Sequence, residues 1–239
     1  MKCFLFLFTS VILTTYCLAQ DKDREREKAK NIAFGADSAV SGDAQLVSHF
    51  IVKGLSYSDN NPAMNASFVA KLHPQIKLGI WGSNVSNLNA VDDNFWLKIF
   101  SRINIDFSDR LFFSLFITDN RFYKSDIRNG QTFGADVNFR NYEFGLELMS
   151  NFEGTRNSAG YLWFGRLYDY RSNLKWGSYA GSTISQSAAY QSYLDFRIVG
   201  QYLFNSISNA ELGVTFNSNS AQFGIRDDPA IYLALKLYY

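Results

Sequence analysis

Cysteine is missing from all but the start of this chain. Its two cysteines, Cys3 and Cys17, lie in an apolar stretch at the N-terminus. Once that stretch is removed, the chain can form neither a disulfide nor a thiolate metal site. Its two histidines, His49 and His73, are well separated in the sequence and make no ligand set. We therefore expect no metal and no cofactor.

Histidine is also scarce as a catalytic base. Ser48 and His49 are adjacent, so on a strand their side chains point to opposite faces and cannot form a nucleophile–base pair. His73 precedes Pro74 in a predicted tight turn. Neither the phosphate-loop nor the dinucleotide-binding glycine pattern occurs. We predict no catalytic residue, and an enzyme is the least favoured class of function.

Neither sign of charge is in excess, and no long apolar run follows the N-terminal stretch. Removal of that stretch takes Lys2 away and leaves 22 basic and 22 acidic residues. Proteins that bind nucleic acid usually carry a basic excess or a basic stripe. The balanced charge therefore argues against a nucleic-acid partner.

Residues 1–19 have the features of an export signal. Lys2 gives a basic start, and the apolar run Phe4–Leu13 is too short to cross a bilayer as a helix. Cys17-Leu18-Ala19 is a small-x-small site, which predicts cleavage after Ala19. Residues 20–43, rich first in charged and then in small polar residues, are predicted to form a periplasmic leader or linker.

Aromatic residues and alternation of apolar with polar residues are what the chain has in abundance. Aromatic side chains make up 17% of it, and in Ile231–Tyr239 every second residue is apolar. A final strand of this kind, ending on an aromatic residue such as Tyr239, is typical of outer-membrane β-barrels, where it is the assembly signal. We therefore expect outer-membrane lipid and the barrel-assembly machinery as partners.

Residues 44–239 are predicted to form one antiparallel transmembrane β-barrel of about twelve strands. A spanning strand needs about 9–11 residues, and most of the segments qualify. The predicted strands are Ala44–Tyr57, Ala63–His73, Ile76–Ser83, Phe95–Phe107, Leu111–Phe122, Gln131–Arg140, Tyr142–Phe152, Tyr161–Tyr170, Leu174–Ser182, Tyr190–Phe204, Ala210–Asn217 and Ala230–Tyr239.

Short connections alternate with longer ones along these segments, as expected for short periplasmic turns and longer extracellular loops. A soluble β-sandwich, the alternative all-β fold, has no reason to sort its loops in this way. We expect the longer loops Asn84–Asn94 and Ser218–Pro229 to narrow the mouth of the barrel. Aromatic rims at the two membrane interfaces are expected from ten residues, of which about a third would instead pack in the lumen: Tyr57, Trp81, Trp96, Tyr123, Tyr142, Trp163, Tyr170, Trp176, Tyr202 and Tyr239.

The polar faces of the segments predict a charged lumen. Charges of both signs tune the ion selectivity of a pore, and balanced numbers predict weak selectivity. The pattern favours passive diffusion of small polar solutes or ions across the outer membrane. It leaves open a structural or adhesion-type barrel without an open pore and, less favoured, an outer-membrane lipid-modifying enzyme. The predicted pore-lining residues are Lys98, Arg102, Asp106, Asp136, Arg140, Glu143, Glu147, Arg166, Asp195, Arg197, Glu211 and Lys236.

A short region resembles a known family. Lys53-Gly54-Leu55-Ser56, then Ser58-Asp59-Asn60-Asn61-Pro62-Ala63 and later Gly79-Ile80-Trp81-Gly82-Ser83-Asn84-Val85 resemble the motifs of the TorF-like porin family. Lys53 replaces the arginine, and Tyr57 the glutamine, that family members typically show. The resemblance covers about a sixth of the chain and implies an outer-membrane barrel without implying a particular solute.

Overall fold

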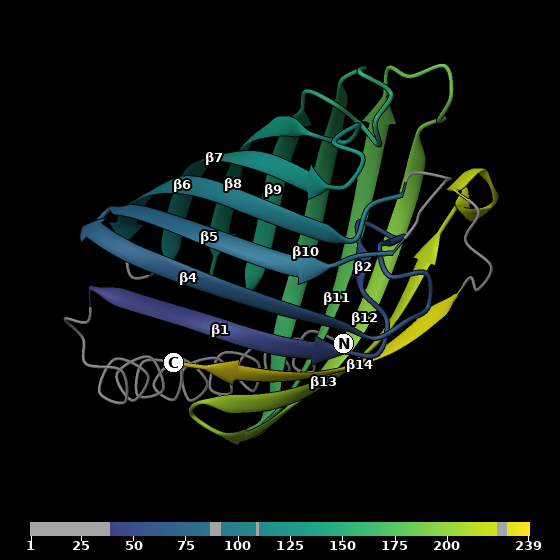
Figure 1. Cartoon of the computed structure of the whole chain (residues 1–239). Coiled ribbons are helices and arrows are strands. Elements are labelled where there is room, and N and C mark those ends of the chain that lie inside the picture. The colour runs from purple at the N-terminus through teal and green to yellow at the C-terminus, as the bar shows by residue number, and fades with distance from the viewer. Residues whose placement is uncertain (1–38, 87–91, 109, 224–228) are drawn as a thin grey trace, which may run out of the picture.

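The computed structural model describes residues 39–86, 92–108, 110–223 and 229–239. The predicted signal peptide, residues 1–19, and residues 20–38 of the predicted leader lie outside the described residues and stay predictions. Twelve strands close into an antiparallel barrel in the order β1-β14-β13-β12-β11-β10-β9-β8-β7-β6-β5-β4 (Figure 1). The predicted fold class is therefore confirmed.

Eleven of the twelve predicted strands are found close to their predicted positions. Alternating residues with β-branched and aromatic side chains favour these extended segments, and every strand pairs with two neighbours. The observed bounds are β4 Ala63–His73, β5 Ile76–Asn84, β6 Phe95–Ser108, β7 Leu111–Tyr123, β8 Gly130–Phe139, β9 Tyr142–Met149, β10 Ala159–Arg171, β11 Leu174–Ser185, β12 Tyr193–Asn205, β13 Ser208–Asn217 and β14 Ala230–Tyr238.

The first predicted strand, Ala44–Tyr57, is wrong. The barrel strand β1 is Val40–Val47, so it begins before Ala44 and ends ten residues before Tyr57. The chain then forms a separate hairpin of β2, Ile51–Val52, and β3, Leu55–Ser56. Its turn is Lys53-Gly54, where both residues have positive φ angles of 53° and 72°. Two such residues form the tight turn that favours a two-residue hairpin, and this breaks the strand.

The predicted alternation of short and long connections is confirmed. Two residues separate successive strands at one end of the barrel, which we call the turn edge. The connections at the other end, the loop edge, are longer, and one of them contains the short 3-10 helix η1, Ser220–Phe223. Val40 and Tyr239 both lie at the turn edge, because β1 and β14 run toward and away from the loop edge respectively.

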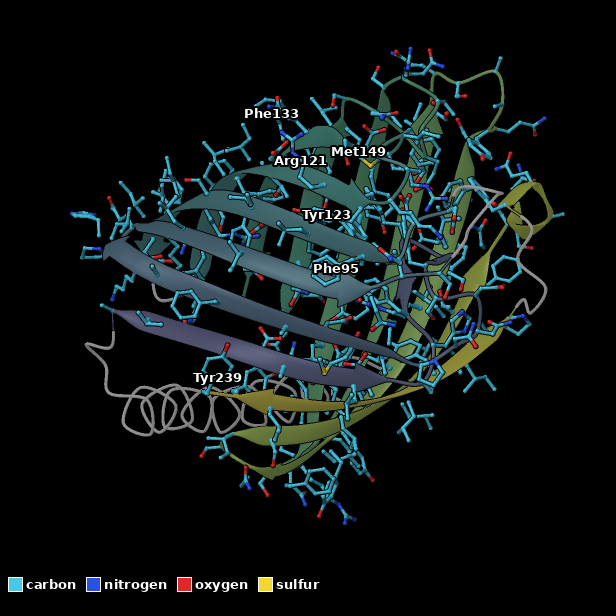
Figure 2. The ribbon with its side chains drawn as sticks, in the orientation of Figure 1. Phe95, Arg121, Tyr123, Phe133, Met149 and Tyr239 are labelled. Atoms are coloured by element: carbon cyan, nitrogen blue, oxygen red, sulfur yellow. The ribbon has the colours of Figure 1, made fainter. Side chains whose placement is uncertain are left out.

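The apolar faces of the strands point outward. Leu146, Ile198 and Leu235 are 40%, 63% and 48% exposed, and no second sheet covers them in the part of the chain that the structure describes. Phe95 and Phe133 likewise lie on the outer surface (Figure 2). Among the described residues, no helix is long and apolar enough to cross a membrane. The opposite faces of the strands enclose the lumen.

The last residue extends the seam at which β14 pairs with β1. The backbones of Gly42 and Tyr239 exchange hydrogen bonds of 2.9 and 3.0 Å, and the Tyr239 hydroxyl donates to the Ser67 carbonyl oxygen at 2.8 Å. A Cβ atom at Gly42 would lie 2.4 Å from the Tyr239 ring, so only glycine leaves room for it. Tyr239 thus ties together β14, β1 and β4.

Candidate functional site: the lumen and its inward hairpin

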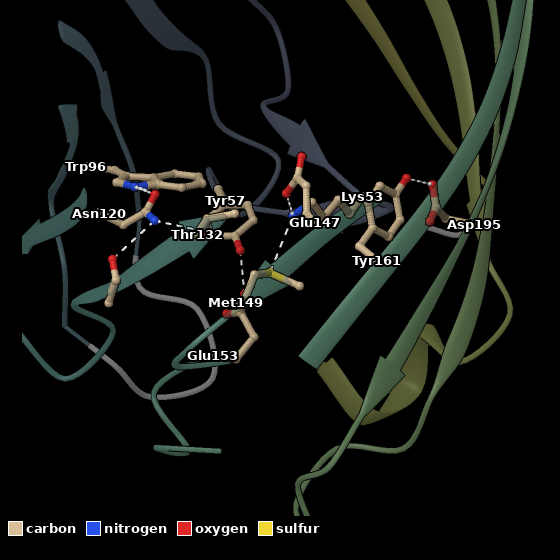
Figure 3. Close-up of polar contacts among 11 residues, drawn as sticks. Lys53, Tyr57, Trp96, Asn120, Thr132, Glu147, Met149, Glu153, Tyr161 and Asp195 are labelled. Atoms are coloured by element: carbon tan, nitrogen blue, oxygen red, sulfur yellow. Dashed lines mark hydrogen bonds and ion pairs between the residues drawn. The ribbon is translucent and has the colours of Figure 1, made fainter. Parts of the chain in front are cut away.

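The hairpin formed by β2 and β3 lies inside the ring of strands (Figure 1). Lys53, at its tip, forms an ion pair with Glu147 on β9, and its Nζ lies 3.4 Å from the Met149 sulfur. In the order of strands around the ring, β9 stands opposite β1, from which the hairpin departs. The hairpin therefore crosses the lumen from one wall to the other, as Figure 3 shows for Lys53 and Glu147.

Further contacts fix the hairpin on both sides of its turn. The Gly54 carbonyl oxygen accepts a hydrogen bond of 3.3 Å from Asn217, at the loop-edge end of β13. The Tyr57 hydroxyl donates to Glu153, whose carboxylate also lies 3.6 Å from the Arg128 guanidinium (Figure 3). Burial, with the neighbouring Glu153 carboxylate, raises the pKa of Tyr57 well above its usual range, so the phenol stays protonated and remains a donor.

The two histidines have structural partners. His49 is buried, and its Nε2 lies 2.7 Å from the Ser56 hydroxyl, which ties the base of the hairpin together. The Ser48 hydroxyl accepts a hydrogen bond of 2.9 Å from the Leu233 backbone N–H. At the turn edge, His73 accepts a hydrogen bond of 3.3 Å from the Gln75 backbone N–H through its Nδ1.

An aromatic cluster packs against the hairpin from the lumen faces of β5, β6 and β7. Phe50 lies 5.7 Å from Trp81, and Tyr57 lies 4.9 Å from Trp96. Trp96 stacks on Phe122 with ring centroids 4.9 Å apart and meets Trp81 edge to face at 5.4 Å. Trp81 and Trp96 therefore belong to the fraction of the predicted rim aromatics that pack in the lumen instead. Alternation along β5 and β6 places both indoles on the same side as the charged residues, away from lipid.

Lys98 of β6 is held by the two tryptophans. Its Nζ lies 4.5 Å from the centre of the Trp81 ring and 4.1 Å from that of the Trp96 ring. A cation over an aromatic face is attracted by the negative face of the ring. No carboxylate of the described residues lies within ion-pair distance of this ammonium group.

The hairpin separates two cavities in the lumen. The first, of about 350 Å³, is bordered by Tyr57, Arg102, Phe122 and Glu147, among others. The second, of about 260 Å³, is bordered on its far side by a polar group that includes Asn65, Arg197, Glu211 and Tyr232. Both cavities share a wall, which consists of Val52, Trp81 and Lys98.

Most of the charged residues predicted to line the pore face the lumen, because they alternate with the exposed apolar side chains of their strands. Arg102 pairs with Asp136 at 3.1 Å, and Lys236 lies 3.9 Å from Asp43. Asp195 accepts a hydrogen bond of 3.2 Å from Tyr161. The residues that face the lumen are Lys98, Arg102, Asp106, Asp136, Glu143, Glu147, Asp195, Arg197, Glu211 and Lys236.

Arg166 does not face the lumen, and its predicted placement is wrong. On β10, Leu162, Phe164 and Arg166 share the outward face, whereas Tyr161 points inward. The Arg166 guanidinium lies 4.3 Å from the Tyr142 ring and 4.1 Å from the Tyr168 ring, near the turn edge. Aromatic neighbours at a membrane interface let a long cationic side chain remain on an outward face.

The predicted placement of Arg140 is also wrong. It lies in the turn between β8 and β9 with a φ angle of 57°, and its guanidinium packs 5.3 Å from the ring of the outward-facing Phe139. The strand ends one residue earlier than predicted, so alternation no longer determines where this side chain points.

Several charged residues of the lumen are not among those predicted from the sequence. Lys53 belongs to the segment predicted to be the first barrel strand, and Arg128 and Glu153 belong to connections predicted to be extracellular loops. The adjacent strands β10 and β11 also place Asp169 directly opposite Lys175, with an ion pair of 3.0 Å. The dipeptide Lys53-Gly54, a tight-turn signal, was the one local indication of the hairpin.

No family model and no curated protein matches this sequence. The resemblance to the TorF-like family therefore rests on the quoted motifs alone. Among solved structures, the barrel is similar to one titled "KdgM porin", with a TM-score of 0.55, 6% identity and coverage of 83% of this chain and 98% of that chain. It is also similar to one titled "KdgM porin in complex with disordered oligogalacturonate", with a TM-score of 0.52, 6% identity and coverage of 84% and 97%.

A NanC porin structure is similar at a TM-score of 0.51, with 9% identity and coverage of 84% of this chain and 98% of that chain. These likenesses extend over nearly the whole length of the other chains. At such low identities, they show that the chain shares the fold of these porins.

Proposed function

We propose that this chain is an outer-membrane porin through which small polar solutes or ions diffuse passively. The observation that carries the proposal is the pair of cavities beside the hairpin, inside a barrel whose charged side chains face inward. A barrel of twelve strands lies between eight-stranded barrels filled by side chains and the wide aqueous channels of 16-stranded porins. The fold shared with structures titled as porins supports the same function.

The orientation in the membrane follows from the lengths of the connections. The turn edge would face the periplasm and the loop edge the outside, as in bacterial barrels. Cleavage of the export signal after Ala19 and recognition of the strand ending at Tyr239 by the barrel-assembly machinery belong to the same proposal. Outer-membrane lipid would cover the exposed apolar face, and the barrel would act without catalysis or a cofactor.

Membership of the TorF-like porin family is proposed as well. Its first motif, Lys53-Gly54-Leu55-Ser56, corresponds to the inward hairpin, and the later motif Gly79–Val85 corresponds to β5 and the residue after it. The resemblance would therefore concern the part of the chain that narrows the lumen.

A barrel without an open pore is the second candidate, and the hairpin itself favours it. The hairpin packs Phe50, Leu55 and Tyr57 into the lumen, and all three side chains are buried. If these contacts persist in the membrane, the remaining space would not connect the two ends.

Single-channel recording in a planar lipid bilayer decides between the two candidates. We expect discrete conductance steps with weak preference between cations and anions, because charges of both signs line the lumen. The control is electrophoretic mobility before and after boiling, which identifies folded barrel. Folded protein that produces no steps would favour the closed barrel over the porin.

A further inference from the structure

We propose that Lys98, together with Trp81 and Trp96, is a binding site in the lumen for small organic anions whose carboxylate is attached to a flat apolar group. The inference rests on the proposed diffusion function, since it takes the lumen to be the path of the solute. It adds to that function a class of solute and the residues that select it.

Lys98 differs from three other cations of the lumen, because no carboxylate of the described residues lies within ion-pair distance of it. Lys53 pairs with Glu147, Arg102 lies 3.1 Å from Asp136, and Lys175 lies 3.0 Å from Asp169. Lys98 contacts two indole faces, and the nearby Glu147 carboxylate that attracts it is beyond ion-pair distance and already paired with Lys53. An ammonium group has three donors, and an aromatic face accepts them only weakly, so the site keeps its capacity to bind an anion.

The carboxylates that border the first cavity already have partners. Glu147 is paired with Lys53, and Glu153 receives the Tyr57 hydroxyl and faces the Arg128 guanidinium. An organic cation entering this cavity would have to break one of these contacts in order to find a counter-charge. An anion would find the Lys98 ammonium without breaking any ion pair. The charge available in the cavity therefore favours anions.

The walls around Lys98 favour a flat apolar group next to the carboxylate. Trp96 lies between Lys98 and Phe122, with its indole 4.1 Å from the ammonium nitrogen and 4.9 Å from the Phe122 ring. A carboxylate held by the ammonium would place its attached group beside these rings, where contact removes apolar surface from water. The volume of about 350 Å³ is at the small end of ligand pockets, which suits a single ring.

Because Lys98 lies between the two cavities, a solute bound to it would affect transport through the lumen. Lys98 borders both spaces on either side of the hairpin. A bound anion would therefore lie at the point where the hairpin divides the lumen, and its residence there would reduce the ion current.

The test compares three probes that share parts of one structure: phenylacetate, acetate and phenethylammonium. Binding is followed by intrinsic tryptophan fluorescence of the folded full-length barrel in detergent, and independently by reduction of single-channel current. We expect phenylacetate to bind about tenfold more tightly than acetate, and phenethylammonium to show no saturable binding.

Lys98→Met should weaken phenylacetate binding by about tenfold or more, because a charged hydrogen bond is lost while the side-chain length is retained. Lys98→Arg should retain binding. Lys77→Met is the matched control, since Lys77 faces the lumen from the neighbouring strand β5 but borders neither cavity. Lys98→Gln repeats the neutral substitution if Lys98→Met fails to fold.

Equal binding of phenylacetate to Lys98→Met and the unaltered protein would overturn the site, as would equal binding of acetate and phenylacetate. Fluorescence separates this failure from failure of the proposed function. Binding that depends on Lys98 without channel steps would support the site and contradict the porin. Channel steps together with phenylacetate binding that does not depend on Lys98 would support the porin and contradict the site.

Discussion

At the scale of single residues, buried charges in the connections hold the hairpin in place. The Arg128 and Glu153 side chains are 2% and 5% exposed, with an ion pair of 3.6 Å between them. Removal of one member of a buried pair leaves the other charge uncompensated. We predict that Glu153→Gln lowers the free energy of unfolding by about 3 kcal/mol, measured by denaturant unfolding of the barrel in detergent.

The matched control for this prediction is the exposed pair of Asp119 and Arg121, 2.8 Å apart on the outward face of β7. Their side chains are 32% and 53% exposed near the loop-edge end of β7, so protein does not enclose this pair as it encloses Arg128 and Glu153. Asp119→Asn should change the free energy of unfolding by less than about 1 kcal/mol. If Glu153→Gln and Asp119→Asn lowered the free energy of unfolding equally, the buried pair of Arg128 and Glu153 would not have the stabilising role proposed for it.

At the scale of elements, the hairpin is the part of the chain that determines how much of the lumen is free. It is anchored at its tip by Glu147 and beyond its turn by Asn217 and Glu153. We predict that replacing residues 49–61 by a short Gly/Ser linker leaves the barrel folded, because the hairpin pairs with no barrel strand. Single-channel conductance should rise, since the replacement joins the two cavities.

Shortening the connection between β11 and β12, residues 186–192, serves as the control for the hairpin replacement. This connection lies at the same loop edge and should leave the conductance unchanged. An unchanged conductance after removal of the hairpin would mean that ions pass elsewhere. Loss of the heat-sensitive mobility would mean that the hairpin is needed for folding.

At the scale of the whole molecule, the direction of the apolar faces separates a membrane barrel from a soluble one. Cysteine is absent after Cys17, so an introduced cysteine can carry a unique spin label in the mature chain. We predict that labels on Leu146→Cys, Ile198→Cys and Leu235→Cys collide frequently with oxygen dissolved in lipid, because these positions face outward. The measurement is power saturation of the spin label in lipid bilayers.

The comparison position for the labels is Glu211, on the lumen face of β13, where its carboxylate accepts hydrogen bonds from Gln201 and Tyr232. A label on Glu211→Cys should respond to a water-soluble relaxation agent and weakly to oxygen. If the three outward labels are shielded from lipid, the chain does not span a membrane through this surface.

The strands, their order and most of their turns could be predicted from the sequence. Alternation with a period of two assigns a side chain to a face wherever a strand is continuous, as in Phe95–Ser108, and the tight turns mark where strands reverse. The same rule correctly assigns Lys98, Arg102 and Asp136 to the lumen. It failed for Arg140 because the strand ends before that residue, and for Arg166 because both faces of β10 carry apolar and aromatic side chains, so alternation does not tell them apart.

By itself, the sequence determined the closed sheet, its edges and the side of the sheet that each strand residue occupies, because these depend on neighbours along the chain. The tertiary structure alone decided that the hairpin of β2 and β3, with the flanking Phe50 and Tyr57, turns into the lumen. Lys53 contacts Glu147, which is 94 residues away in the sequence, and Gly54 contacts Asn217, which is 163 residues away. Local periodicity carries no information about such a contact, since its free energy arises only after the barrel has closed and brought the opposite wall within reach.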